Sequence, residues 1–357
     1  MAPTRRSNAT MKMVADRAGV SMMTVSRVIN ERAGVAQTTR RRVEEAMREL
    51  RYQPHPFAQQ LAGGNSNMLG VLLYDHGHAI SGMYTDILQG LQQELSDHAH
   101  DLLFFSPRAA EDSLPRILDS PLIEGLILMG TSLTGEHITA LRQSAVPFVV
   151  IGRREVADYV APFVAPNYAR AFEAALRQMR RSGIKRVVSI INGYPNALEE
   201  QNTAQAAIRE RLAGIDRARR SRSGADELSV SLVSSDATFM DGYAMAAAWS
   251  PIPEGIILDS TDFSFGVSMA LRDRNLKIPD EVTVYGIDYE NHVIERAALV
   301  LNAAIPAWSI PWGRIATVAA QELLAVIQAK RVRPLARYID LEARVFAPPR
   351  RDHRGRK

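Results

Sequence analysis

One short stretch of the chain carries side chains suited to reading a nucleic acid. Between residues 22 and 29, Val25, Val28 and Ile29 recur at helical spacing and mark an inward face. The opposite face presents Met22, Met23, Ser26, Arg27 and Asn30. The Arg27 guanidinium can donate two parallel hydrogen bonds to a guanine edge, and methionines can contact a thymine methyl. The alternative is that both methionines fill the core of a small helical unit.

Three short helices are expected to position this face. Thr10 is a good N-cap for a first helix that ends near Arg17, and Gly19 permits the tight turn that follows. Ser21 can cap the second helix, and a third is expected around Val43–Leu50. Two helices joined by a Gly-containing turn are typical of a helix-turn-helix. A helical bundle whose arginines form only a solvated face is the alternative.

Three runs in the first 63 residues extend the pattern beyond two helices. They read VADRAGVSMMTVSRVIN (14–30), TRRRVEEAMRELRYQPH (39–55) and AQQLAG (58–63). Together they resemble the lactose-repressor (LacI/GalR) family of bacterial transcription regulators, and weaker similarity continues to about Pro348. The resemblance implies binding to double-stranded DNA through Ser21, Met22, Met23, Thr24, Ser26, Arg27, Asn30, Thr39, Tyr52, His55, Ala58 and Leu61.

The resemblance assigns different contacts within this set. The two methionines stand at the main base-reading positions of the family, where we expect apolar contact. Positions that mostly hold phosphates, and so fix the register on DNA, are Ser21, Thr24, Asn30, Thr39 and Tyr52. His55 stands where relatives usually have Asn. Ala36 replaces the Ser that usually caps the third helix, which leaves Thr38 or Thr39 as the substitute.

A hinge is expected after the third helix. Pro54 and Pro56 break that helix, and residues 57–62 have the length of a short helix that is unstable alone in water. The resemblance implies that this helix folds only when paired with its twofold mate on DNA, with Leu61 inserted into the minor groove. An ordinary linker that ends in glycines is the alternative.

The distribution of charge agrees with a nucleic-acid partner at one end. The 357-residue chain has a net charge of +4, but residues 1–65 hold 11 Lys and Arg against five acids. Residues 350–357 add a basic tail, so the remaining residues must be acidic on balance. A basic front on an acidic body is the electrostatic footprint of a protein that presents one end to DNA.

The composition argues against several other classes of protein. There is no cysteine, which excludes disulfides and thiolate chemistry and agrees with a cytoplasmic location. No apolar run approaches 18 residues and the N-terminus has no apolar segment, so neither a membrane span nor a secretory signal is expected. Phosphate-binding, nucleophile and zinc motifs are absent, so we expect no enzyme, cofactor or metal. A solute-binding protein of similar fold would need an export signal and would lack the first 63 residues.

From Met68 onward, short apolar strands alternate with amphipathic helices. Strands are expected near 69–74, 101–106, 125–130, 147–152, 186–191, 228–233, 255–260 and 282–287. This alternation predicts parallel sheets covered on both faces, and two such runs give two Rossmann-like lobes. The resemblance implies a periplasmic-binding-protein-like pair of lobes whose chain crosses near Val164, Val293–Ala297 and Arg331–Pro334.

The expected fold is therefore an all-α helix-turn-helix headpiece followed by an α/β core of two lobes. The predicted segments are a flexible basic arm (1–9), the headpiece (10–53), the hinge (54–65), the core (66–349) and a basic tail (350–357). Within the core, the N-lobe is expected to comprise 66–164 and 297–330, and the C-lobe 165–296 and 331–349. The tail has no heptads to support a coiled-coil tetramer, and two headpieces demand a palindromic site, so we expect a homodimer.

A ligand is expected between the lobes, at the carboxyl ends of the strands. The candidates for binding it are His76, Tyr84, Arg153, Glu200, Asn202, Ser260 and Asp288. Asp288 matches the ligand-binding acid of the family, and a helix cap is the equally weighted alternative. Glu200 and Asn202 stand near the usual Arg, and Ser260 with Thr261 replaces the usual Asn-Asp. Loss of that Arg argues against an ordinary free sugar.

These features together predict a transcription regulator, most simply a repressor. It would bind a palindromic operator as a homodimer, with an affinity modulated by a small-molecule effector such as a sugar or related metabolite. A regulator that has no effector is the alternative, and Glu200 facing Arg153 or His76 would then close the cleft without a ligand. A small-molecule-binding or enzymatic Rossmann-like protein conflicts with residues 1–63.

Overall fold

The chain divides into two compact units in the computed structural model, Met1–Met68 with Asp119–Glu124 and Leu69–Leu118 with Gly125–Lys357. The residues that the structure describes are 9–30, 32–53, 66–73, 82–105, 113–129, 134–156, 159–192, 203–220, 228–234, 238–259, 261–288, 291–329 and 335–348. The hinge, the tail and nearly all of the expected arm lie outside them. No helix in these ranges combines the length and apolarity needed to cross a membrane.

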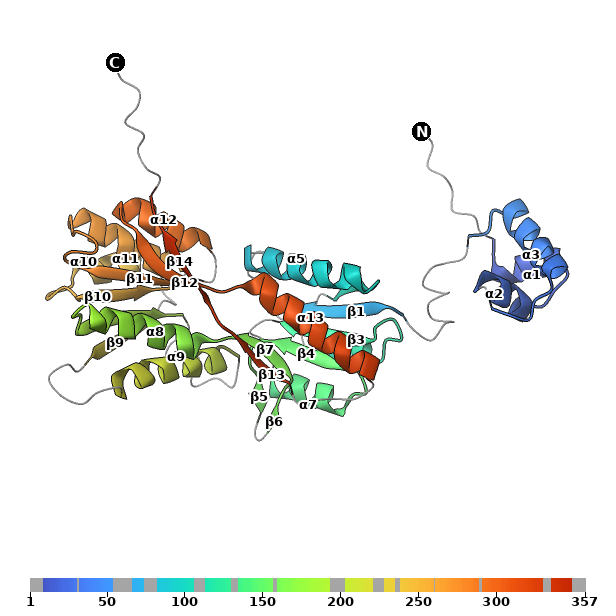
Figure 1. Cartoon of the computed structure of the whole chain (residues 1–357), viewed down its shortest axis with the longest axis horizontal. Helices are drawn as coiled ribbons and strands as arrows, with labels where there is room; N and C mark the ends of the chain where they lie inside the picture. Colours follow the sequence, from blue (N-terminus) through green and yellow to red (C-terminus); the bar gives the residue numbers. More distant parts are fainter. Residues whose placement is uncertain are drawn as a thin grey trace, which may run out of the picture. The chain divides into compact units, whose positions relative to one another are not determined.

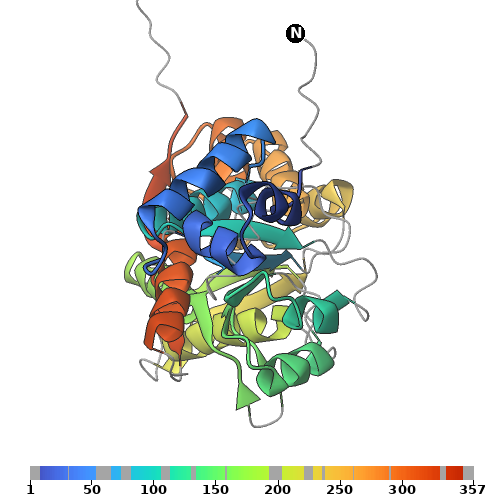
Figure 2. The same cartoon turned by 90° about the vertical axis from the view of Figure 1, so that its right-hand side faces the viewer.

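In the described part of the first unit, helices α1 (Met11–Ala18), α2 (Met22–Ile29) and α3 (Gln37–Glu49) pack about one small core (Figures 1 and 2). The Thr10 and Ser21 hydroxyls cap α1 and α2 by accepting hydrogen bonds from the N–H groups of Met13 and Thr24, at 3.3 and 3.2 Å. Gly19 makes the turn in the left-handed conformation, with φ of 62°. The buried core, which confirms the helix-turn-helix, consists of Val14, Ala15, Ala18, Val25, Val28, Val43 and Ala46.

The start of α3 differs from the expectation. Ala36 occupies the N-cap position, and no side chain caps this helix. Thr38 and Thr39, expected as substitutes, lie inside the first turn. A cap must come from the residue that precedes the helix, because only its extended backbone lets a side chain reach the free N–H groups. The first turn of α3 therefore lacks the acceptor that α1 and α2 have.

The first lobe of the core is built on a six-stranded sheet with the order β13-β7-β4-β3-β1-β2. Its strands are β1 (Met68–Leu73), β2 (Asp101–Phe105), β3 (Gly125–Met129), β4 (Phe148–Ile151), β7 (Phe163–Pro166) and β13 (Ala336–Ile339). The pairs from β13 to β1 are parallel. The helices of this lobe are α5 (Gly82–Asp97), α6 (Ser113–Leu118), α7 (Gly135–Gln143) and α13 (Trp312–Ala329). Helices α5 and α13 pack side by side (Figure 1).

The second lobe has a six-stranded sheet with the order β14-β12-β11-β10-β8-β9. Its strands are β8 (Arg186–Ile191), β9 (Ser229–Ser234), β10 (Gly255–Leu258), β11 (Thr283–Asp288), β12 (Ile305–Ser309) and the antiparallel β14 (Glu342–Phe346). Helices α8 (Tyr168–Arg181) and α9 (Thr203–Arg220) cover one face. The other face carries α10 (Phe239–Ala247), α11 (Asp262–Asp273) and α12 (Asn291–Leu301) (Figure 1). The two lobes confirm the predicted fold class.

Two of the three expected crossings between the lobes are corrected. The chain returns to the first lobe after β12, not near 293–297, because α12 and β12 belong to the second lobe. It leaves again between β13 and β14, not near 331–334. Strand β12 alternates buried and half-buried side chains and contains Pro306, so it lacks the continuous apolar run that marks its neighbours. The pairing of β13 with β7 and of β14 with β12 is a tertiary choice that local sequence does not encode.

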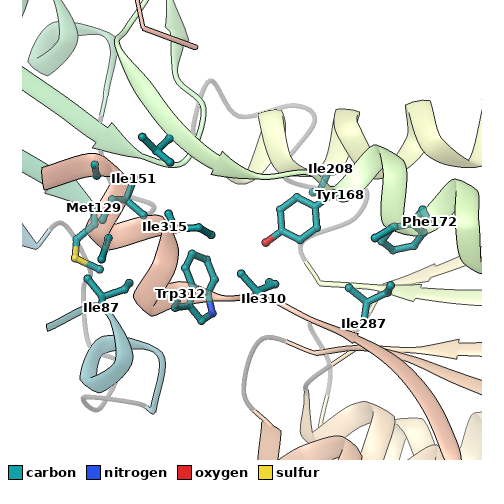
Figure 3. Close-up of a cluster of buried hydrophobic side chains, with 14 of the residues drawn as sticks. Ile87, Met129, Ile151, Tyr168, Phe172, Ile208, Ile287, Ile310, Trp312 and Ile315 are labelled. Carbon is teal, nitrogen blue, oxygen red and sulfur yellow. The ribbon is translucent and has the colours of Figure 1, made fainter. Parts of the chain in front are cut away.

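One apolar cluster runs through both lobes (Figure 3). Tyr168, Ile310 and Trp312 lie where the chain passes between the sheets. On the side of the first lobe they are joined by Ile87, Met129, Ile151 and Ile315, and on the side of the second by Phe172, Ile208 and Ile287. Burial of this cluster holds the two lobes as parts of one unit, since apolar area removed from water stabilises by roughly 25 cal/mol per Å².

We predict that Gly90 is essential to the packing of α5 against α13. A Cβ built on Gly90 would lie 2.2 Å from the backbone oxygen of Gly313, which cannot move without shifting its helix. Gly90→Ala should therefore lower the free energy of unfolding by roughly 2–3 kcal/mol. Gly82→Ala in the same helix is the control, since no other described part of the chain places an atom within 4 Å of its Cβ position. Urea unfolding of both variants checks this, and equal stability would contradict it.

We also predict that a cap can be added to α3. Ala36→Ser should raise the local stability of the headpiece by about 1 kcal/mol, because the new hydroxyl accepts from a free N–H in the first turn. Thr10→Ala, which removes the cap of α1, should lower it by a similar amount. Amide hydrogen exchange of the headpiece in the full chain measures both changes. If Thr10→Ala lowers the stability of the headpiece but Ala36→Ser does not raise it, then the first turn of α3 does not lack a cap.

Candidate functional site

The outward face of α2 is the first candidate site. Val25 and Val28 are buried, whereas Met22 and Met23 are 54% and 66% exposed, so the methionines do not fill the headpiece core. Arg27 is exposed, and no described residue forms an ion pair with it. The face therefore offers two long apolar side chains beside a guanidinium that is available for a partner.

Hydroxyl and amide groups around α2 are partly engaged within the headpiece. The Asn30 amide donates to the Ser26 hydroxyl at 3.3 Å, one helical turn away. The hydroxyls of Ser21 and Thr24 lie 2.9 Å apart, beside the cap of α2. These bonds fix the side chains in place while leaving them at the surface or half-buried.

Helix α3 presents basic residues with different roles. Arg40 donates to the backbone oxygen of Val28 at 3.4 Å and so ties α3 to the end of α2. Arg41 and Arg42 are exposed, and no described residue pairs with them. Thr39 is half-buried, and Tyr52 packs against the headpiece core. His55, Ala58 and Leu61 lie outside the described residues.

The predicted effector residues are only partly described. His76, Glu200, Asn202 and Ser260 lie outside the described residues. Asp288 ends β11, where it pairs with Ser309 of β12, so its backbone is at the carboxyl edge of the second sheet as expected. The Tyr84 side chain lies in the apolar cluster on α5, and Arg153 lines a different cavity.

A buried acid at the same sheet edge was not predicted. Asp259 follows β10 and is buried, and its Oδ1 accepts hydrogen bonds from the Thr261 and Ser264 hydroxyls at 2.5 and 2.7 Å. Thr261 also caps α11. The sequence contains a sign of this acid, because Asp259 is a carboxylate at the end of an apolar run. It was missed because the expected strand, 255–260, included Asp259.

A cavity of about 550 Å³ lies between the first lobe and helices α8 and α9 of the second. It is lined by Arg153, Glu155, Asn167, Ala169, Ala206, Arg209, Glu210, Ala213, Arg217 and Tyr338. Glu155, in the short β5 (Glu155–Val156) that pairs with β6 (Tyr159–Val160), accepts from Arg153 at 2.7 Å and from Arg209 of α9 at 3.0 Å. The Tyr338 hydroxyl donates to Glu210 at 2.6 Å and accepts from Arg153 at 3.1 Å. These bonds join the first lobe to α9.

Burial perturbs two groups of this cavity. It raises the pKa of the Glu210 carboxyl, and the hydrogen bond from Tyr338 opposes the change only in part. Burial and the neighbouring Glu210 raise the pKa of Tyr338 to about 12. Among the described residues, no group of three or more His, Asp or Glu could hold a metal ion. The arrangement is suited to non-covalent binding of a polar ligand.

Two family models match the chain. The model of bacterial regulatory proteins of the lacI family matches residues 10–55. The model of periplasmic binding proteins and the sugar-binding domain of the LacI family matches residues 66–330. The matches fall on the three-helix unit and on the two-lobed core, and together they span more than half of the chain.

Known proteins resemble the chain along most of its length. Catabolite control protein A of Priestia megaterium is 27% identical over 288 residues, which cover 79% of this chain and 82% of that protein. The HTH-type transcriptional regulator PtxS of Pseudomonas aeruginosa is 26% identical over 336 residues, 91% of each. The lac repressor dimer bound to operator and the anti-inducer ONPF has a TM-score of 0.69 at 19% identity, covering 95% of this chain and 98% of that one. The CelR–cellobiose complex has a TM-score of 0.62 at 21% identity, covering 94% and 98%.

We predict that ionised Glu210 destabilises the core at neutral pH. A raised pKa in the folded state gives stability that is present below the ordinary value of 4.5 and lost as pH rises through the raised pKa. Glu210→Gln keeps an acceptor for Tyr338 and removes this loss. The variant should therefore gain stability relative to the wild type as pH rises from 4 to 7.

Glu254→Gln provides the control of opposite sign. Backbone hydrogen bonds from Lys185 and Arg186 help to lower the pKa of Glu254, so its contribution is present at neutral pH and lost as pH falls. Thermal unfolding across pH 4–7 measures both variants. If the difference in stability between Glu210→Gln and the wild type does not change with pH, ionised Glu210 does not destabilise the core.

Proposed function

Because the chain belongs to the lacI family of bacterial regulatory proteins, we propose that it binds a palindromic operator as a homodimer and represses transcription. It is a DNA-binding transcriptional regulator with an effector-binding domain, and the family consists of such regulators rather than of enzymes. The observation that carries the proposal is the exposed face of α2, with Met22, Met23 and Arg27 outward over two buried valines. Two headpieces double the contacts of one, and twofold symmetry of the protein requires twofold symmetry of the operator.

Recognition would combine three kinds of contact. Arg27 would donate to a guanine edge, and the methionines would pack on thymine methyls. Phosphates would be held, and the register fixed, by Ser21, Thr24, Asn30, Thr39 and Tyr52. The hinge residues Ala58 and Leu61 would enter the central minor groove. This activity belongs in the cytoplasm, where bacterial chromosomal DNA lies.

An effector between the lobes would control the affinity for DNA. The carboxyl edge of the second sheet supports this, since Asp288 and buried Asp259 end adjacent strands there. His76, Tyr84, Glu200, Asn202 and Ser260 complete the proposed set. The CelR structure holds cellobiose and the lac repressor structure holds the anti-inducer ONPF, as their names state. Glu200 and Asn202 near the usual Arg position favour a ligand other than a free sugar here.

Replacing Arg27 tests the DNA-binding proposal. With an operator selected from random DNA, Arg27→Ala should weaken binding about 5- to 150-fold, the equivalent of 1–3 kcal/mol. The loss should vanish when the guanine that Arg27 contacts is replaced, because the contact is then already missing. Arg181→Ala, an exposed arginine of the second lobe, is the control and should bind normally. Affinities are measured at one fixed salt concentration. Equal affinity of Arg27→Ala for the selected operator would count against the proposed face.

A screen of ligands tests the effector proposal. Operator affinity is measured with sugars, sugar phosphates, nucleobases and acidic metabolites. One class should shift the affinity at least tenfold, and Asp288→Asn should abolish the shift without changing DNA binding in the absence of ligand. Unchanged affinity with every class would instead favour a regulator that has no effector.

A further inference from the structure

The interlobe cavity beside α9 is separate from the effector site proposed above. Its lining comes from the first lobe, from the start of α8 and from one face of α9. None of its described lining residues belongs to a strand of the second sheet, at whose carboxyl edge Asp259 and Asp288 lie. The cavity is therefore free to take a ligand of its own.

The charges around this cavity favour an anion. Three arginines line it against two glutamates. Arg153 and Arg209 both bond to Glu155, while Glu210 is bonded by Tyr338. Arg217 lines the same space, and no described acid pairs with it. Among the lining residues that the structure describes, cations therefore exceed anions by one, even with both carboxyls ionised.

The size and the donor geometry narrow the class of ligand. A volume of about 550 Å³ falls within the range of small-molecule sites, which is roughly 300–1,000 Å³. Guanidinium groups from the first lobe and from α9 line the cavity, and such groups can bind a phosphate or carboxylate through paired N–H donors. We propose that this cavity binds a small metabolite that carries a phosphate or carboxylate group, held by Arg209 and Arg217 of α9 and by Arg153 of the first lobe.

Glu155 has a specific role in this proposal. Its carboxylate lies against Arg153 and Arg209, which are the groups that an anion would use. Both ion pairs are partly exposed and so contribute little to stability, on the order of 0–1 kcal/mol. An incoming anion can therefore displace Glu155 at small cost and bridge the lobes in its place. Binding of the anion does not depend on the proposed function. If the bound anion also changes the affinity for DNA, that effect does rest on the proposed function.

Calorimetry on the full chain without DNA tests the site. The probes are inorganic phosphate, glycerol 3-phosphate and citrate at constant ionic strength, with glycerol as the neutral control. At least one anion should bind saturably, and glycerol should not. Arg217→Gln and Arg209→Gln should each weaken that binding at least tenfold, while Arg181→Gln should not change it.

The variant Glu155→Gln should change the affinity for the anion in the opposite direction. It removes the competing carboxylate, so it should tighten anion binding several-fold, which a misfolded protein would not do. No saturable binding of any anion, or binding unaffected by Arg217→Gln and Glu155→Gln, would overturn the proposal. Operator binding measured with the same samples separates this result from the proposed function, because loss of DNA binding leaves anion binding in place.

Discussion

The apolar cluster shared by the lobes is the contact on which the placement of the interlobe groups depends. Tyr168, Ile310 and Trp312 fill the space where the chain passes from one sheet to the other. Their burial fixes α8 and α13 with respect to both sheets, and α9 packs on α8. The exposed ion pairs nearby are too weak to do this, at about 0–1 kcal/mol each. Packing therefore sets the positions of these charged groups.

In the headpiece, too, apolar packing sets the positions of the polar and charged side chains. Val25 and Val28 are buried, and this burial determines which side of α2 faces outward. No described residue pairs with the exposed Met22, Met23 or Arg27 side chains, so this face is available for a partner. A helix of eight residues would not be stable alone, and the core that it shares with α1 and α3 supplies its stability.

The sequence predicted the features that local periodicity determines. The caps at Thr10 and Ser21, the turn at Gly19 and most strands of the core lie where they were expected. Periodicity did not reveal β12, because its side chains are only alternately buried and Pro306 interrupts its hydrogen bonding.

Long-range partners could not be predicted either. Glu155 and Arg209 are 54 residues apart and Tyr338 and Glu210 are 128 apart, so only the fold brings them together. Arg153 was expected to bind effector, and nothing in its local sequence indicated the cavity beside α9.

Sequence-specific binding can be tested by selecting DNA from a random pool with the purified full chain. We expect enrichment of one sequence with two inverted half-sites, protected symmetrically in a footprint, since a twofold dimer would present two copies of α2. Enrichment of no sequence, with binding that depends only on salt, would contradict sequence-specific regulation by this protein.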